Sequence, residues 1–179
     1  VAEPIGNHHT SFAPYNAYPC AGDNRWCVIA VETEKQWAAL IEVTEIREWA
    51  DDPRFRDRAS RKSHEIDIDK RLSEWTKNYS PSQVMYLLQK VGVPAGVVQD
   101  AEDLYRDYHL REKGYLVEVN QPFTGNVINP GVTIRLGGLT DVQPKGAPYL
   151  GQDNQYVYSE LLGLSAKMIR EYSDKGIFV

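Results

Sequence analysis

The stretch GDNRWCVIAVETEKQW (22–37) predicts a turn, a strand and the first turn of a helix in quick succession. The turn residues 22–24 precede RWCVIAV (25–31), a compact β-branched and aromatic run that is typical of a buried strand. Thr33 and Gln36 then occupy the N-cap and N3 positions of a capping box, whose side chains satisfy free backbone N–H groups at a helix start. The stretch therefore indicates a chain that mixes α and β structure.

Hydrophobic periodicity predicts further helices downstream. Ile68, Leu72, Trp75 and Tyr79 recur at spacings of 4, 3 and 4 and are expected on one face of a helix that begins near Ser63. Upstream of that helix, the polar stretch ADDPRFRDRASRK (50–62) contains a proline and is expected to be a solvated loop. Residues 1–22, rich in glycine, proline, asparagine and aromatic residues, are expected to be extended or looped.

The sequence SPSQ (80–83) marks another helix start, with a serine cap, proline at the first helical position and glutamine at N3. Gly92 is expected to end this helix, since glycine readily takes the left-handed conformation found there. The buried face of the helix is expected to consist of Val84, Leu87, Leu88 and Val91.

The second half of the chain contains shorter predicted elements. Residues 137–151 hold four glycines and two prolines and form the clearest linker. The expected elements are a strand over 95–98, short helices over 100–105 and 108–113, a hairpin of YLVEV (115–119) and TIRL (133–136) with a turn at Gly125-Asn126, and closing helices over 153–162 and 166–174, the last capped by Ser165. Because these elements do not alternate as regular βαβ units, the fold class is expected to be α+β.

Composition excludes several functional classes. The 179 residues carry 20 Lys+Arg against 25 Asp+Glu, a net charge of −5, and no basic run, which argues against a nucleic-acid surface. The longest apolar run, 26–31, is too short to cross a membrane. The N-terminal residues show no signal peptide, and two cysteines are too few for a disulfide framework. A cytoplasmic protein is expected.

The residues alone reveal no catalytic machinery. His8-His9 is the most conspicuous polar pair; it suits a substrate or metal contact, or simply two exposed loop histidines. Neither a G-x-S-x-G motif around Ser11 or Ser60 nor a glycine-rich phosphate loop is present. The remaining candidates have plain interpretations: His64 and His109 as solvated helix residues, Cys20 and Cys27 as small buried hydrophobes, and Asp51-Asp52 and Asp67–Asp69 as solvated faces.

Read as strings, four segments resemble the class III CoA-transferases in the order expected along the chain. This family includes formyl-CoA and crotonobetainyl-CoA transferases and the related α-methylacyl-CoA racemases. The segments are GNHHTSFAPYNAYPCAGDNRWCVIAVETEKQWAAL (6–40), WADDPRF (49–55), GVPAGVVQDAEDLYRDYHLREKGYLVEV (92–119) and APYLGQDNQYVYSELLGLSAKMI (147–169), of which the last two are the most specific. Because family members are considerably longer, the chain is similar to their C-terminal part only.

The resemblance implies a covalent mechanism with coenzyme A as substrate and no covalently bound cofactor. A family aspartate attacks the acyl-CoA thioester, and an anhydride and an enzyme-bound CoA thioester follow before the acceptor acid collects the CoA. That aspartate belongs upstream of Val1, so no aspartate here inherits its role and no catalytic residue is assigned. The formyl-CoA transferase lid is glycine-rich, whereas HHTSFAPY (8–15) stands at its place, which argues against formyl-CoA and oxalate.

The resemblance also implies domains, site residues and partners. Residues 1–22 correspond to a lid-like loop, 23–136 to a small α+β domain, and 137–179 to a returning linker and closing helices. The loop is expected to face the acyl group, and the substrate-binding residues are expected to be Gly6, Asn7, His8, His9 and Tyr15. Acyl-CoA and either an N-terminal half or a second copy are the expected partners, with no nucleic acid and no membrane.

Three functions follow from this resemblance. The first is the C-terminal portion of a CoA-transferase, inactive alone; the second is half of an acyl-CoA racemase-type enzyme, in which a base removes the α-proton; the third is a non-catalytic binding or oligomerisation module. In each, the closing helices need a cover for their apolar faces. The expected exposed patch consists of Tyr156, Leu161, Leu162, Leu164, Met168 and Ile169.

Overall fold

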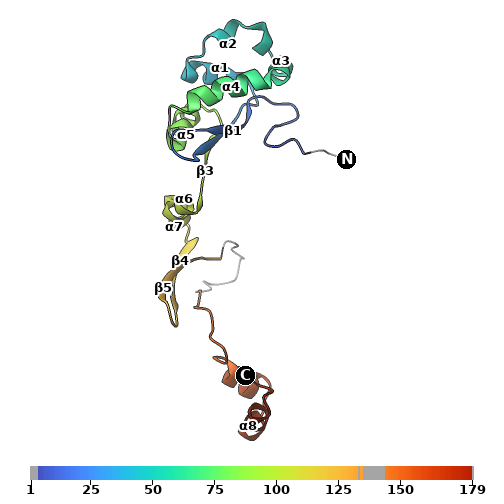
Figure 1. Ribbon diagram of the computed structural model, residues 1–179, viewed down its shortest axis with the longest axis vertical. Helices are drawn as coiled ribbons and strands as arrows, with labels where there is room; N and C mark the ends of the chain where they lie inside the picture. Colours follow the sequence, from blue (N-terminus) through green and yellow to red (C-terminus); the bar gives the residue numbers. More distant parts are fainter. Residues whose placement is uncertain (1–3, 133, 135–143, 179) are drawn as a thin grey trace. The chain divides into compact units, whose positions relative to one another are not determined.

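The computed structural model describes residues 4–132, 134 and 144–178 (Figure 1). The chain forms two compact units, Val1–Asp100 and Ala101–Val179. Both contain helices and strands, which agrees with the expected α+β class. Among the described residues, no helix combines the length and apolar character needed to span a bilayer.

A three-stranded antiparallel sheet organises the first unit. Its strands are β1 (Tyr15–Pro19), β2 (Trp26–Ala30) and β3 (Ala95–Val98), in the order β1-β2-β3. The predicted strands over 25–31 and 95–98 are thus confirmed. The sequence pattern did not identify β1 as a strand, because its asparagine and its terminal proline are unusual in strands. An edge strand tolerates both, and proline ends this one.

Helices cover one face of this sheet. The helix α1 (Glu34–Thr44) and the helix α5 (Pro81–Lys90) both begin with the predicted capping boxes, and α4 (Glu65–Thr76) lies between them in the sequence. In α5, Val84 and Leu88 are buried, but Val91 is 37% exposed and so does not belong to the buried face as expected. Val91 lies just beyond the last helical turn, where the backbone leaves the helical path.

The polar stretch 50–62 is the clearest correction to the sequence analysis. It is not a solvated loop: α2 (Glu48–Asp51), η1 (Pro53–Phe55) and α3 (Arg58–Ser63) follow each other there. Asp52 and Asp57 each accept a backbone N–H at the start of the next turn, so acidic residues that look solvated act as caps. Among the residues of this stretch, Phe55 and Arg61 are buried.

One hydrophobic core fills the space between the sheet and the helices. Trp37 and Trp49 stack with ring centroids 5.1 Å apart, and Phe55 meets Trp49 edge-on at 5.9 Å. Arg61 places its guanidinium 4.9 Å from the Trp37 ring centroid. The other buried members of the core are Tyr18, Cys20, Cys27, Ile29, Val31, Leu40, Ile46, Ile68, Leu72, Val84, Leu88 and Val93.

The second unit contains short helices and one hairpin. The helices α6 (Ala101–Arg106) and α7 (Tyr108–Glu112) fall close to their predicted places. The strands β4 (Leu116–Gln121) and β5 (Gly125–Pro130) form an antiparallel hairpin. The second strand therefore begins at Gly125, which was expected in the turn, and is not TIRL (133–136), most of which lies outside the described residues. The predicted linker over 137–151 lies partly outside them as well.

Two short helices close the unit. The first is a π-helix, η2 (Tyr156–Leu161), and the second is α8 (Ala166–Asp174), where the Ser165 side chain accepts the Met168 N–H as predicted. Phe178 stacks on Tyr158 with ring centroids 3.8 Å apart. Of the expected exposed patch, Tyr156, Leu161, Leu162 and Met168 are exposed, whereas Leu164 and Ile169 are half-buried.

Candidate functional site

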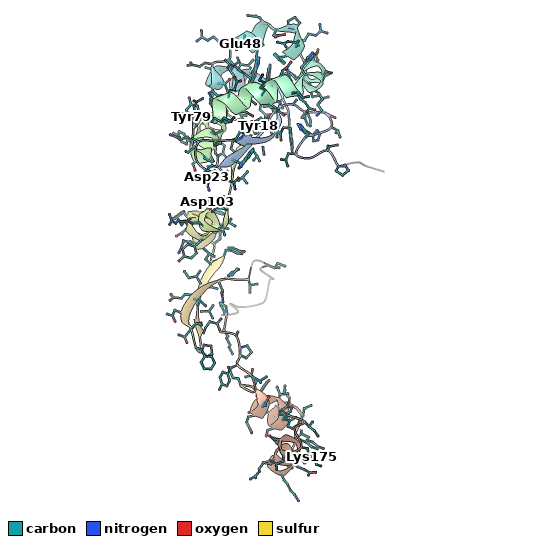
Figure 2. The ribbon with its side chains drawn as sticks, viewed as in Figure 1. Tyr18, Asp23, Glu48, Tyr79, Asp103 and Lys175 are labelled. Carbon is teal, nitrogen blue, oxygen red and sulfur yellow. The ribbon has the colours of Figure 1, made fainter. Side chains whose placement is uncertain are left out.

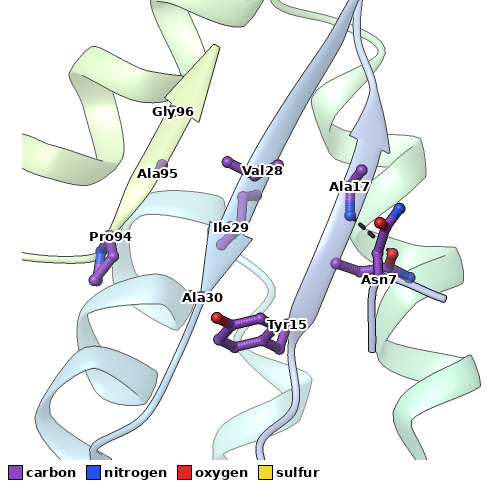
Figure 3. Close-up of a pocket in the computed structure, with 10 residues that line it drawn as sticks. Asn7, Tyr15, Ala17, Val28, Ile29, Ala30, Pro94, Ala95 and Gly96 are labelled. Atoms are coloured by element: carbon purple, nitrogen blue, oxygen red, sulfur yellow. Dashed lines mark hydrogen bonds between the residues drawn. The ribbon is translucent and has the colours of Figure 1, made fainter. Parts of the chain in front are cut away.

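A cavity of about 440 Å³ lies on the sheet of the first unit (Figure 3). Residues from all three strands contribute to it, together with one residue of the N-terminal loop. Its size falls within the range of small-molecule sites in proteins. The lining residues are Asn7, Tyr15, Asn16, Ala17, Val28, Ile29, Ala30, Pro94, Ala95 and Gly96.

Strand alternation places this cavity on the face of the sheet that the core does not use. In β2, Cys27 and Ile29 are buried, and Val28 between them is 44% exposed. Ala17 and Gly96 are the register partners of Val28 on the two neighbouring strands, so all three share its face. The cavity floor is therefore an apolar, solvent-facing sheet surface with small residues at its centre.

The loop that precedes β1 borders the cavity through aromatic contacts. The His9 ring lies 5.2 Å from the ring of Tyr15, a lining residue, and 4.6 Å from the ring of Phe12. The guanidinium of Arg58, on α3, lies 5.2 Å from the Phe12 ring centroid. These contacts hold the middle of the loop over the start of β1.

The two adjacent histidines of this loop make different contacts. His8 directs its Nδ1 toward α4, 3.3 Å from Glu65 Oε2 and 3.9 Å from Asp69 Oδ2. His9 Nδ1 instead accepts the Ser11 backbone N–H at 3.0 Å. Because that nitrogen accepts a hydrogen bond, neutral His9 carries its proton on Nε2, which is then a donor. His8 thus anchors the loop to a helix, and His9 offers an N–H group beside Tyr15.

Asp69 joins the loop anchor to the sheet. It accepts the Tyr18 hydroxyl at 2.6 Å and the Asn16 amide at 2.8 Å, so the expectation of a solvated Asp67–Asp69 face is wrong for Asp69. Tyr18 belongs to β1, and its hydroxyl reaches Asp69 on α4 (Figure 2). Burial raises the pKa of Tyr18 well above its usual value, and the Asp69 charge raises that pKa further. The tyrosine therefore stays protonated and donates to a carboxylate.

The structure brings together most of the predicted substrate-binding residues. Asn7 and Tyr15 line the cavity, His9 packs against Tyr15, and His8 belongs to the α4 anchor. Gly6 precedes Asn7 with a φ of 66°, a left-handed conformation that favours glycine.

Sequence reasoning missed the sheet residues of the site, Val28 and Gly96 among them. The alternation of side chains along RWCVIAV indicates that one face of the strand points away from the core. It does not indicate that a cavity forms on that face.

The other candidate residues are not among those that line the cavity. Cys20 and Cys27 are buried free thiols, and burial raises the pKa of both, which keeps them in the unreactive protonated form. His64 Nδ1 lies 2.9 Å from the Ser60 carbonyl oxygen, and His109 lies in α7. Within the described part of the chain, no group of three or more His, Cys, Asp or Glu side chains is arranged to hold a metal ion.

The described lining of the cavity suits an apolar group of a ligand. The described lining residues are uncharged: Asn7, Tyr15 and Asn16 have polar side chains, and the others are apolar or glycine. Such a cavity can hold an apolar group against the sheet. Its described lining includes no Ser, Thr, Cys, His, Lys, Asp or Glu side chain.

Comparison with known proteins places this chain in a family. The family model described as CoA-transferase family III matches residues 1–154. Succinyl-CoA–D-citramalate CoA-transferase of Chloroflexus aurantiacus is 31% identical over 165 residues, which cover 92% of this chain and 41% of that protein. Human succinyl-CoA:glutarate CoA-transferase is 23% identical over 98% of this chain and 40% of its own length.

Solved structures show the same fold. A CAIB/BAIF family protein from Brucella suis superposes with a TM-score of 0.78 at 24% identity, over 89% of this chain and 40% of that one. The chain thus spans about two fifths of the length of the relatives it matches.

Proposed function

Since the chain belongs to CoA-transferase family III, we propose that it forms the C-terminal part of an enzyme that moves CoA from an acyl-CoA to a carboxylic acid. The observation that carries the proposal is the uncharged cavity beneath the loop at 6–15, in a chain that matches 41% of a succinyl-CoA–D-citramalate CoA-transferase. In this proposal the chain supplies the acyl-binding wall, and another polypeptide segment supplies the nucleophile. The chain alone is then inactive.

The proposed reaction follows the covalent route of the family. An aspartate from the completing segment attacks the thioester carbonyl, forms a mixed anhydride and releases the CoA thiolate. The thiolate attacks the aspartyl carbonyl of the anhydride, which frees the first acid and leaves an aspartyl-CoA thioester. The acceptor carboxylate then attacks the aspartyl-CoA thioester, which gives a second mixed anhydride and the CoA thiolate. The thiolate attacks the acceptor carbonyl of that anhydride, so the acceptor leaves as its CoA thioester and the aspartate is regenerated. Both anhydrides hydrolyse readily, so the loop must exclude water.

The residues of this chain would orient the acyl group. We assign the His9 Nε2–H to the acyl carbonyl or carboxylate, because its other nitrogen is occupied by Ser11 and its ring borders Tyr15. His8 is assigned a positioning role, because Glu65 and Asp69 hold it on α4. Asn7, a lining residue, follows Gly6 in the same loop.

The experiment combines this chain with the part of the Chloroflexus citramalate transferase that it does not match. Transfer of CoA from an acyl-CoA to an isotopically labelled acid is followed by mass spectrometry. We expect transfer by the mixture and none by either part. His9→Gln is expected to lower kcat/KM about 10- to 100-fold, the cost of one hydrogen bond to a charged group. Ser82→Ala, an exposed change on α5, is the control and leaves transfer unchanged.

Other outcomes would contradict the proposal in distinct ways. Exchange of the α-hydrogen for deuterium without CoA transfer would indicate racemase-type chemistry. A stable homo-oligomer with no affinity for CoA, and no transfer with any partner segment, would indicate a non-catalytic module.

A further inference from the structure

The cavity on the sheet carries information about which acyl group it receives. Its outward-facing side chains include Ala17, Val28 and Ala30, and Gly96 leaves open space at the centre. We propose that the site takes CoA thioesters of uncharged, short aliphatic acids and discriminates against dicarboxylic acyl groups. This inference rests on the function proposed above and adds the substrate class to it.

A second carboxylate has no cation to meet in this cavity. Every lining residue in the described part of the chain is uncharged. Transfer of an unpaired carboxylate from water into apolar surroundings is strongly unfavourable. The relatives named above act on D-citramalate and glutarate, which are dicarboxylic acids. The substrate class inferred for this chain therefore differs from the dicarboxylic acids in the names of those relatives.

The basic side chains of the loop anchor already face carboxylates of α4. Asn16, a lining residue, donates its amide to Asp69 Oδ2 at 2.8 Å. Glu65 and Asp69 both face His8, and Lys62 is paired with Glu65. The described loop anchor therefore offers no unengaged basic side chain to a second carboxylate.

The size and lining of the cavity favour an aliphatic chain of several carbons. A volume of about 440 Å³ is more than a formyl group needs. Each methylene group buried against Ala17, Val28 and Ala30 is expected to tighten binding about fourfold (about 0.8 kcal/mol, at about 1.4 kcal/mol per tenfold). Affinity should therefore rise from acetyl to butyryl.

The test measures transfer by the completed enzyme with acetyl-, butyryl- and succinyl-CoA as donors. We expect kcat/KM to rise about 10-fold from acetyl to butyryl, and to be at least about 10-fold lower for succinyl than for butyryl. Transfer that is faster with succinyl, or independent of chain length, would overturn the inference. The absence of transfer with every donor would instead overturn the proposed function.

Two variants test whether this cavity is the cause. Gly96→Val fills it, and the fold should tolerate the change because a Cβ at this position would meet Val28 Cγ2 at 3.4 Å, an ordinary contact. It is expected to abolish the preference for butyryl over acetyl. Val28→Lys adds a cation to the cavity and is expected to raise the succinyl-to-butyryl ratio at least about 10-fold.

Val91→Lys is the matched control, because Val91 is 37% exposed, similar to Val28 at 44%, and is not among the residues that line the cavity. It should leave both ratios unchanged. Donor ratios that stay the same in Gly96→Val and Val28→Lys would show that the acyl group binds elsewhere, and would overturn the inference.

Discussion

The two units differ far more in how many apolar side chains they bury than in how well their helices are capped. In the first, helix caps, strand alternation and aromatic side chains all lead to one core that contains Trp37, Trp49 and Phe55. In the second, Asp107 and Ser165 cap their helices just as well. Of the residues described from 101 onward, however, Val119 is the only buried hydrophobic one. Local rules therefore suffice to form elements, whereas a core needs apolar surface from distant parts of a chain.

This difference bears on how the second unit is stabilised. A two-stranded hairpin and helices of five to nine residues are marginal in water by themselves. The exposed apolar side chains of the unit would stabilise it when another surface covers them. Those with the largest exposed fractions include Phe123, Leu150, Leu161, Leu162 and Ile134.

The largest expected effect comes from a pair of phenylalanine truncations, one in each unit. Phe55 is 2% exposed among aromatic rings, so Phe55→Ala is expected to cost about 3–5 kcal/mol in the free energy of unfolding. Phe123 is 90% exposed, so Phe123→Ala should change it by less than about 0.5 kcal/mol. Denaturant unfolding followed by tryptophan fluorescence measures Phe55→Ala, because all four tryptophans lie in the first unit, and unfolding followed by far-ultraviolet circular dichroism measures Phe123→Ala in the second. A similar loss in both variants would contradict the contrast between the units.

The same contrast explains which features the sequence predicts well. Capping boxes at Thr33 and Ser80 depend on residues three apart and were predicted to the residue. The burial of Phe55 and Arg61 was not predicted, because a polar stretch reveals nothing of the aromatic rings that pack on it from elsewhere. The site divides in the same way. The histidine loop is visible in the sequence, but the cavity and the Asp69 anchor arise from strand and helix contacts between residues some fifty positions apart.

An intermediate effect is expected from the buried hydroxyl of Tyr18. Tyr18→Phe removes a 2.6 Å hydrogen bond to Asp69 and should cost about 1–2 kcal/mol at neutral pH. Burial raises the pKa of Tyr18, so above its unfolded pKa, near pH 10, the unfolded chain loses the proton before the folded one does. The stabilisation is present below that pH and is lost as the pH rises toward the folded pKa.

The measurement is the free energy of unfolding between pH 7 and pH 11, again from tryptophan fluorescence. The wild-type chain should lose more stability than Tyr18→Phe above pH 10. Tyr86→Phe, at a side chain that is 65% exposed, is the control and should follow the wild type. If the two variants behaved alike, the Asp69 anchor would have no energetic role in the first unit.

Smaller effects are expected from two matched helix caps. The Ser80 side chain accepts the Gln83 N–H in the first unit, and the Ser165 side chain accepts the Met168 N–H in the second. Ser80→Ala should lower the free energy of unfolding by about 1 kcal/mol. Ser165→Ala should reduce helical circular dichroism locally and leave the tryptophan-detected transition in place, because α8 contributes no buried residue. A shift of that transition by Ser165→Ala would show that the two units unfold together.

The smallest effects are expected from two ion pairs, one in each unit. Arg61, 2% exposed, donates to both carboxylate oxygens of Glu34 at 2.6 and 3.0 Å, and this lowers the pKa of Glu34. Lys175 meets Glu171 at 2.6 Å on the surface of α8, where both partners are exposed. Glu34 is itself largely exposed, so solvent screening limits the cost of Glu34→Gln to about 1 kcal/mol, and Glu171→Gln should cost close to nothing.

Acid titration of the wild type and both variants separates these pairs. Because the folded pKa of Glu34 lies below its unfolded value, its stabilisation is present above the unfolded pKa, near pH 4.5, and is lost as the pH falls through the folded pKa. The difference between wild type and Glu34→Gln should therefore shrink below about pH 4. Arg61 keeps its hydrogen bond to the Phe55 carbonyl oxygen throughout, which explains why the loss is modest. A difference that persists at pH 3 would mean that Glu34 supports the core through packing and not through its charge.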